Sequence, residues 1–172
     1  MQSILVAVDG SELSRKALGM AIDLAVQNDA KLSIVHVHLH GRPVDELSKM
    51  AEVEHMVSQA STNLQLGAGR PIPSTIAGVL EHALDPTEVI TGIGDFILAS
   101  ARDDANEAGL ENVPTYSRDG DYADGILDTA DESGADLIVM GQRGLGRFRQ
   151  MILGSVSNKV VQNANCNVLI VK

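Results

Sequence analysis

Residues 135–157 read ADLIVMGQRGLGRFRQMILGSVS, and this stretch decides the fold of the chain. It begins with the apolar run ADLIVM, which is typical of a strand buried inside a parallel sheet. Gly141 and Gly144 follow the run directly, and a helical pattern starts near Val156. A strand, a glycine-rich loop and a helix in this order are typical of α/β proteins that bind a ligand beyond the carboxyl ends of their strands.

The rest of the chain repeats this alternation of short apolar runs and helical patterns. Without internal repeats, it predicts one domain over residues 1–172, with an extended helical connection at about 43–112. We expect a Rossmann-like α/β fold, a doubly wound five-stranded parallel sheet in the strand order 3-2-1-4-5 with helices on both faces. The strands are expected at 4–8, 31–39, 112–117, 135–140 and 168–171. The helices are expected at 11–26, about 45–60, about 76–84, 87–108, 122–132 and 156–165.

Local signals refine two of these boundaries. The hydroxyl of Ser11 or Ser14 can cap the first helix by accepting a backbone N–H. The polar residues 118–121 are expected to form a turn that leads into the helix at 122–132.

Composition excludes several classes of function. Hydrophobic residues make up 44% of the 172 residues, with two Phe, two Tyr and no Trp, so the core must be aliphatic. The net charge of −10 argues against a nucleic-acid surface, because a phosphate backbone is bound by clustered Lys and Arg. The single Cys166 excludes an intramolecular disulfide, and its surroundings in the sequence suggest packing rather than catalysis. The apolar start is too short for a signal peptide or a membrane span, so we expect a cytoplasmic protein.

The loop after the strand ADLIVM is a candidate polyphosphate site. The residues GQRG at 141–144 are followed by nine residues and then by GS at 154–155. Glycines let the backbone approach a ligand, and the start of the next helix offers unpaired N–H groups to phosphate oxygens. Arg143, Arg147 and Arg149 concentrate positive charge here in an acidic chain. The alternative is a plain loop whose glycines form turns and whose arginines are solvated.

Asp9 ends the first strand and is the second candidate. A carboxylate at this place faces the ligand crevice of a doubly wound sheet, where it can accept from a hydroxyl or bind Mg²⁺. The alternative is that Asp9 only forms a turn or caps a helix.

These motifs resemble the universal stress protein family, in its ATP-binding branch. The signature of that branch is G-x-x-G, nine residues, then Gly followed by Ser or Thr, and Gly141, Gly144, Gly154 and Ser155 match it. The middle of the chain, about 43–112, is similar only in being helical and is longer than the usual connection of the family. The other similar segments are ILVAVDGSE at 4–12, SIVHV at 33–37, LGSVSNKVV at 153–161 and CNVLIV at 166–171.

The resemblance implies a site for ATP, or for ADP or AMP. Asp9 would lie near the nucleotide and a bound Mg²⁺, while Ala7 and Val37 would lie against the adenine. The loop glycines would approach the ribose and the phosphates, with Arg143 assisting, and the start of the last helix would bind phosphates through N–H groups and hydroxyls. The implied nucleotide-binding residues are Ala7, Asp9, Val37, Gly141, Arg143, Gly144, Gly154, Ser155, Val156 and Ser157.

The function expected from these features is regulatory. An ATP-binding stress-response protein would switch or dock a protein partner according to nucleotide occupancy. The alternatives are a slow ATP-hydrolysing enzyme, although no dedicated base or nucleophile is evident, and a docking scaffold that has lost its nucleotide. A dinucleotide or flavin enzyme would carry G-x-G-x-x-G after its first strand, where this chain has Asp9, Gly10 and Ser11.

Two further patterns complete the expectations. The last strand, Val168 to Val171, is apolar and would lie at a sheet edge, which favours a two-fold homodimer; the family resemblance points the same way. His36, His38 and His40 alternate on one face of a strand, but no second set of metal ligands accompanies them, so no metal site is assigned to them.

Overall fold

The computed structural model describes residues 1–38, 86–144 and 153–172. The helices expected at about 45–60 and 76–84 lie outside the described residues, as do His40, Arg147 and Arg149.

Strands and helices alternate along the described residues, as the sequence predicts. The strands are β1 (Ser3–Ala7), β2 (Lys31–His38), β3 (Thr115–Asp119), β4 (Leu137–Gly141) and β5 (Asn167–Val171). The helices are α1 (Glu12–Asn28), α4 (Pro86–Glu107), α5 (Tyr122–Ser133) and α6 (Ser155–Asn163). Among these residues, no helix has the length and apolar character needed to span a lipid bilayer.

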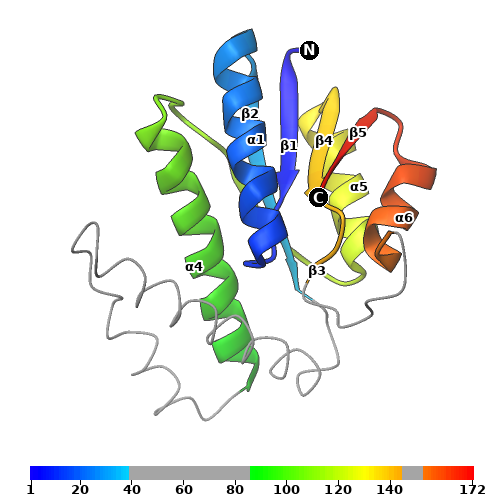
Figure 1. Ribbon diagram of the computed structural model, residues 1–172. Helices are drawn as coiled ribbons and strands as arrows, with labels where there is room; N and C mark the ends of the chain where they lie inside the picture. The colour runs from blue at the N-terminus through cyan, green and yellow to red at the C-terminus, as the bar shows by residue number, and fades with distance from the viewer. Residues whose placement is uncertain (39–85, 145–152) are drawn as a thin grey trace.

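All five strands form one parallel sheet in the order β3-β2-β1-β4-β5, which confirms the predicted topology. The chain winds outward from β1 to β3, then returns to place β4 on the other side of β1. The strand order therefore reverses between β1 and β4, where ligands bind in sheets of this kind. Figure 1 shows these two strands side by side at the centre of the molecule.

Helices cover both faces of the sheet, because its central strands are apolar on both sides. In β1, Ile4 and Val6 pack in a cluster with residues of α1 and α4, whereas Leu5 packs with residues of α5 and α6. Figure 1 shows α1 and α4 on the near face and α5 behind the sheet. The fold is therefore doubly wound.

The helix ends follow local chemistry. Ser11 Oγ accepts from the Ser14 N–H at 3.2 Å, which confirms Ser11 as the cap of α1. Asp121 Oδ1 caps α5 by accepting from the N–H groups of Ala123 and Asp124 at 3.0 and 3.1 Å. Gly134 ends α5 with φ of 62°, in the left-handed region that glycine adopts without strain.

The prediction for residues 118–121 was wrong in its first half. Arg118 and Asp119 belong to β3 and pair with Val37 and His38 of β2. The Arg118 guanidinium lies 5.2 Å from the centroid of the Tyr116 ring, and Arg118 Nε donates to Thr129 Oγ1 at 3.1 Å. Polar residues can continue β3 because it is an edge strand whose side chains find partners on its own surface and on α5.

Candidate functional site

Asp9 and Gly144 meet where β1 and β4 end. Asp9 follows β1, Gly144 follows β4, and a Cβ built on Gly144 would overlap Asp9 Oδ2. The other carboxylate oxygen, Oδ1, accepts from the Ser11 N–H at 3.0 Å. Asp9 therefore does form the turn into α1, and it also presents its second oxygen to the glycine loop. A role of Asp9 in the turn and a role in facing a ligand are therefore compatible, because each involves a different carboxylate oxygen.

The loop between β4 and α6 is closed at its base by one carbonyl group. Gln142 O accepts from the Gly154 N–H at 3.0 Å and from Ser157 Oγ at 2.8 Å. A Cβ on Gly154 would lie 3.2 Å from the same oxygen, which is tighter than ordinary packing. Gln142 was missed in the sequence because it acts through its backbone, which residue type does not reveal. The Ser157 hydroxyl, predicted to bind phosphate, is 2% exposed and bonded to this carbonyl.

The start of α6 has the features of an anion site. Its cap residue is Gly154, no side chain of the described residues caps it, and its first turn contains no acidic residue. The Gly154 carbonyl already accepts from the Asn158 N–H at 2.9 Å, so the helix is formed from its first turn. The N–H groups of Ser155, Val156 and Ser157 precede the first intrahelical donor, and they carry the positive end of the helix dipole. In contrast, Ser11 and Asp121 fill this place in α1 and α5.

The nearest lysine of α6 is directed elsewhere. Lys159 Nζ lies 3.1 Å from Asp121 Oδ1 and 2.7 Å from Asp124 Oδ1, both at the start of α5. Hydrogen bonds to Asp124 and Asp121 raise the pKa of Lys159 above its ordinary value. Because Lys159 is already paired with two carboxylates, backbone N–H groups are the main donors that α6 offers to an anion.

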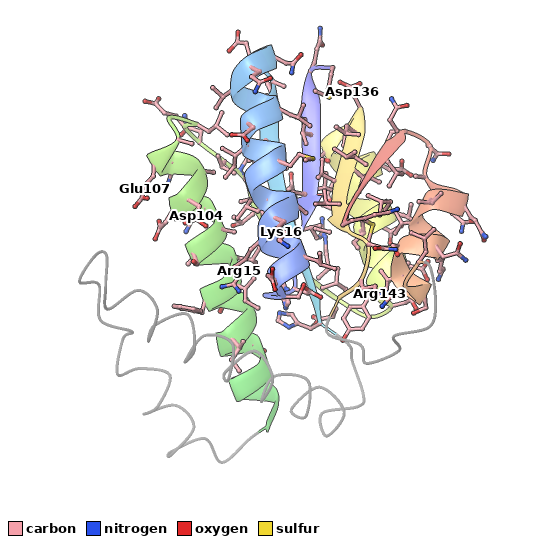
Figure 2. The ribbon with its side chains drawn as sticks, in the orientation of Figure 1. Arg15, Lys16, Asp104, Glu107, Asp136 and Arg143 are labelled. Carbon is pink, nitrogen blue, oxygen red and sulfur yellow. The ribbon has the colours of Figure 1, made fainter. Side chains whose placement is uncertain are left out.

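Arg143 is the described arginine of the predicted loop. Figure 2 shows it at the carboxyl ends of the strands, beside the start of α6, and at the opposite end of the sheet from Asp136. The structure therefore brings Arg143 to the end of the sheet that holds Asp9 and Gly144.

Ala7 and Val37 lie at the ends of β1 and β2. The registered pairing of these strands stops at Ala7 and Val35, so Val37 extends beyond the last pair. Its side chain is 6% exposed and packs on α5, where a Cβ at Gly125 would lie 2.9 Å from Val37 Cγ1. The Val37 side chain is thus a core group, and its backbone is the part that extends past β1.

The described residues offer a limited set of ligands and nucleophiles. Among the described residues, no three His, Cys, Asp or Glu side chains lie close enough together to bind a metal ion. Oxygen atoms of a phosphate group or of water could complete the coordination of a cation at Asp9. Burial, followed by the charge of Asp131, raises the pKa of the Cys166 thiol, which disfavours the reactive thiolate.

Together, these features define a Rossmann-like α/β protein whose switch point combines a carboxylate, a glycine loop and a helix start that no described side chain caps. Comparison with known proteins identifies the family within this class. The chain belongs to the universal stress protein family, whose sequence model matches residues 1–172. The family membership expected from the motifs is thereby confirmed.

Individual relatives match along nearly the whole chain. Universal stress protein YxiE of Bacillus subtilis is 38% identical over 170 residues, which is 98% of this chain and 97% of YxiE. Among solved structures, a universal stress protein in complex with cAMP has a TM-score of 0.62 at 24% identity, over 99% of this chain and 97% of its own. A universal stress protein from Archaeoglobus fulgidus in complex with dAMP has a TM-score of 0.52 at 21% identity, over 100% and 98% of the two chains. At these identities, the two structures establish the fold.

Proposed function

We propose that this protein binds an adenine nucleotide, ATP or its products ADP and AMP, between the ends of β1 and β4. The proposal rests on one observation: Asp9 and Gly144 are in direct contact at the switch point of the sheet. The cAMP and dAMP complexes of structurally similar family members support an adenine nucleotide as the ligand. Nucleotide occupancy would then regulate how the protein docks a partner in the cytoplasm.

The phosphates would be bound mainly by the backbone. The N–H groups of Ser155, Val156 and Ser157 converge at the start of α6, and the exposed Ser155 hydroxyl adds a donor. Gly141 and Gly144 allow the chain to pass close to the ribose and the phosphates. Gly154 has no side chain, so its backbone can lie close to Gln142 O at the base of the loop. Arg143 supplies positive charge at the same end of the sheet.

Asp9 gives the site a requirement for a cation. A carboxylate beside a polyphosphate is repulsive unless a positive charge lies between them. Mg²⁺ is commonly bound through one or two carboxylates together with phosphate oxygens and water, which matches the single carboxylate at this place. Asp9 Oδ2 is the candidate ligand, since it is the oxygen that faces Gly144 and the loop.

The adenine would lie toward β2. Ala7 is half-buried at the end of β1, and the backbone of Val37 continues past it. Backbone N–H and C=O groups at such a strand end can pair with the edge of a purine. Slow ATP hydrolysis stays the second candidate, because Asp9 and Mg²⁺ would lie near the phosphates.

The proposal is tested by mass identification of small molecules released from the denatured, purified protein, followed by calorimetric titration with Mg·ATP. Gly144→Ala adds a Cβ that must displace the Asp9 carboxylate, so we expect affinity to fall by about tenfold or more. Gly19→Ala is the matched control, because a Cβ on that α1 residue meets nothing within 4 Å. Equal affinity in Gly144→Ala and wild type would contradict the site.

The same preparation separates binding from catalysis. ADP that forms from ATP at enzyme-like rates in Mg²⁺ would favour the hydrolytic alternative. We expect bound ATP to remain intact over the time of the titration.

A further inference from the structure

His36 connects β2 to the residue that precedes Asp9. Its Nδ1 lies 2.7 Å from the carbonyl oxygen of Val8, and the two residues are 7% and 6% exposed. The Val8 N–H donates to Val35 O at 2.9 Å. Val8, the residue that leads into Asp9, is therefore held to β2 twice, through its N–H by the backbone of Val35 and through its C=O by the ring of His36.

The chemistry of this contact fixes the direction of the hydrogen bond. A carbonyl oxygen only accepts, so His36 Nδ1 must carry the hydrogen and donate it. The contact is buried, where a carbonyl that loses its donor has no water to replace it. His36 thus limits rotation of the peptide between Val8 and Asp9.

Neighbouring groups prevent the His36 ring from turning away. The ring of His38 meets it edge to face, with centroids 4.6 Å apart and planes at 79°. His38 Nε2 is in turn 3.1 Å from Ser117 Oγ of β3. On the other side, α4 passes so close that a Cβ on Gly94 would overlap His38 Cε1 and lie 2.9 Å from His36 Cδ2. The ring of His36 is therefore fixed by β2, β3 and α4 together.

We propose that His36 is a positioning residue of the nucleotide site, which acts through Val8 on the carboxylate of Asp9. This inference rests on the proposed function. Its physical basis is the tight fit between Asp9 and Gly144, where the space for a single added carbon is already filled by Oδ2. A small rotation of the preceding peptide would move that oxygen away from the glycine and from any cation and phosphate beside it.

The test compares variants that keep or remove the donor. His36→Leu removes it, and we expect the affinity for Mg·ATP to fall about tenfold, as is usual when a supporting partner of a ligand-binding group is lost. His36→Asn places an amide N–H near the position of Nδ1 and should restore affinity to within about twofold of wild type. His36→Gln carries the same amide one carbon further and should not. The comparison of Asn with Gln remains informative if His36→Leu fails to fold.

Two controls separate positioning from general damage to the fold. Leu32→Ala truncates a buried side chain on the same face of β2 but leaves the contact to Val8, so it should lower the free energy of unfolding without lowering affinity. The second control is a double-mutant cycle with Asp9→Asn. If His36 acts through Asp9, His36→Leu should not weaken nucleotide binding any further in a protein that already carries Asp9→Asn.

The outcomes are distinct. Additive losses in the cycle, or equal affinities for His36→Asn and His36→Gln, would overturn the role of His36 while leaving nucleotide binding intact. Failure of the wild-type protein to bind any adenine nucleotide would overturn both proposals.

Discussion

At Gly144, the absence of a side chain makes room for Asp9, because a Cβ at this position would overlap Asp9 Oδ2. The two oxygens of Asp9 have different neighbours: Oδ1 holds the turn through Ser11, and Oδ2 faces the loop. A glycine in a binding loop is often explained by flexibility. Here its effect is steric, since it lets a carboxylate from one strand end reach the backbone of another.

The two serines at the start of α6 differ in what their hydroxyls do, which gives the first prediction. Ser157→Ala removes the donor to Gln142 O, and we expect it to lower the free energy of unfolding by about 1 kcal/mol. Ser155 is exposed, so Ser155→Ala should leave stability unchanged and weaken nucleotide binding by a few-fold, about 0.5–1.5 kcal/mol. Urea unfolding and calorimetric titration of both variants measure the two effects. The reverse pattern would show that Ser157 is the phosphate-binding hydroxyl.

At the scale of elements, α5 and β2 approach closely because α5 has a glycine where Val37 packs. A Cβ at Gly125 would lie 2.9 and 3.0 Å from the two methyl carbons of Val37. Gly125→Ala should therefore lower the free energy of unfolding by about 1–3 kcal/mol through overpacking. The better helix propensity of Ala should offset up to about 1 kcal/mol of this loss. Combining it with Val37→Ala should cost less than the sum of the two single changes, measured by urea unfolding. Simple additivity would mean that the two residues do not compete for space.

The starts of β1 and β4 are joined by the carboxylate of Asp136, and this contact predicts a dependence on pH. Asp136 Oδ2 accepts from the N–H groups of Gln2 and Ser3 at 2.6 and 3.0 Å. These hydrogen bonds, first that of Gln2, lower the pKa of Asp136 below its ordinary value of 3.8. A lowered pKa means that the unfolded chain takes up the proton first, so the stabilisation is complete above 3.8 and is lost as the pH falls through the lower, folded value.

Asp136→Asn isolates that contribution. The amide oxygen can still accept from both N–H groups but does not titrate in acid, so the variant should lose less stability than wild type between neutral pH and about pH 3. Urea midpoints measured across this range give the comparison. Parallel pH profiles for the two proteins would contradict the assignment to Asp136.

The sequence predicted elements well where the chain is apolar and less well where backbone or edge effects decide. The apolar runs of β1, β2 and β4 and the strand order were predicted correctly. The end of β3 was not, because Arg118 and Asp119 resemble turn residues until their pairing with β2 is known. In the proposed site, the sequence named Asp9 and Gly144, which the structure brings together, but the contacts of the Gln142 carbonyl and of the His36 ring depend on geometry that residue type does not reveal.

For the whole molecule, the feature that favours assembly is β5, which is an edge strand of the sheet in the part of the chain that the structure describes. The residues between Asn167 and Val171 are apolar and only half-buried. Asn167 and Val171 direct their backbone groups to β4, since the Asn167 N–H donates to Asp136 O and Val171 O accepts from Gln142. By the alternation of a strand, the N–H groups of Val168 and Ile170 point away from β4, toward the edge. We propose that this edge pairs antiparallel with β5 of a second copy, giving a two-fold homodimer.

Ile170→Pro tests this dimer because it removes one outward N–H and leaves the ladder to β4 in place. Light scattering should then report a dimer for wild type and a monomer for Ile170→Pro at micromolar concentration. Ile170→Ala is the matched control: it loses the apolar side chain but keeps the N–H, so it should weaken the dimer less than proline does. Urea unfolding checks that both variants remain folded. A monomeric wild type would refute the dimer, and a dimer that survives in Ile170→Pro would place the interface elsewhere, because pairing through β5 needs that N–H as a donor.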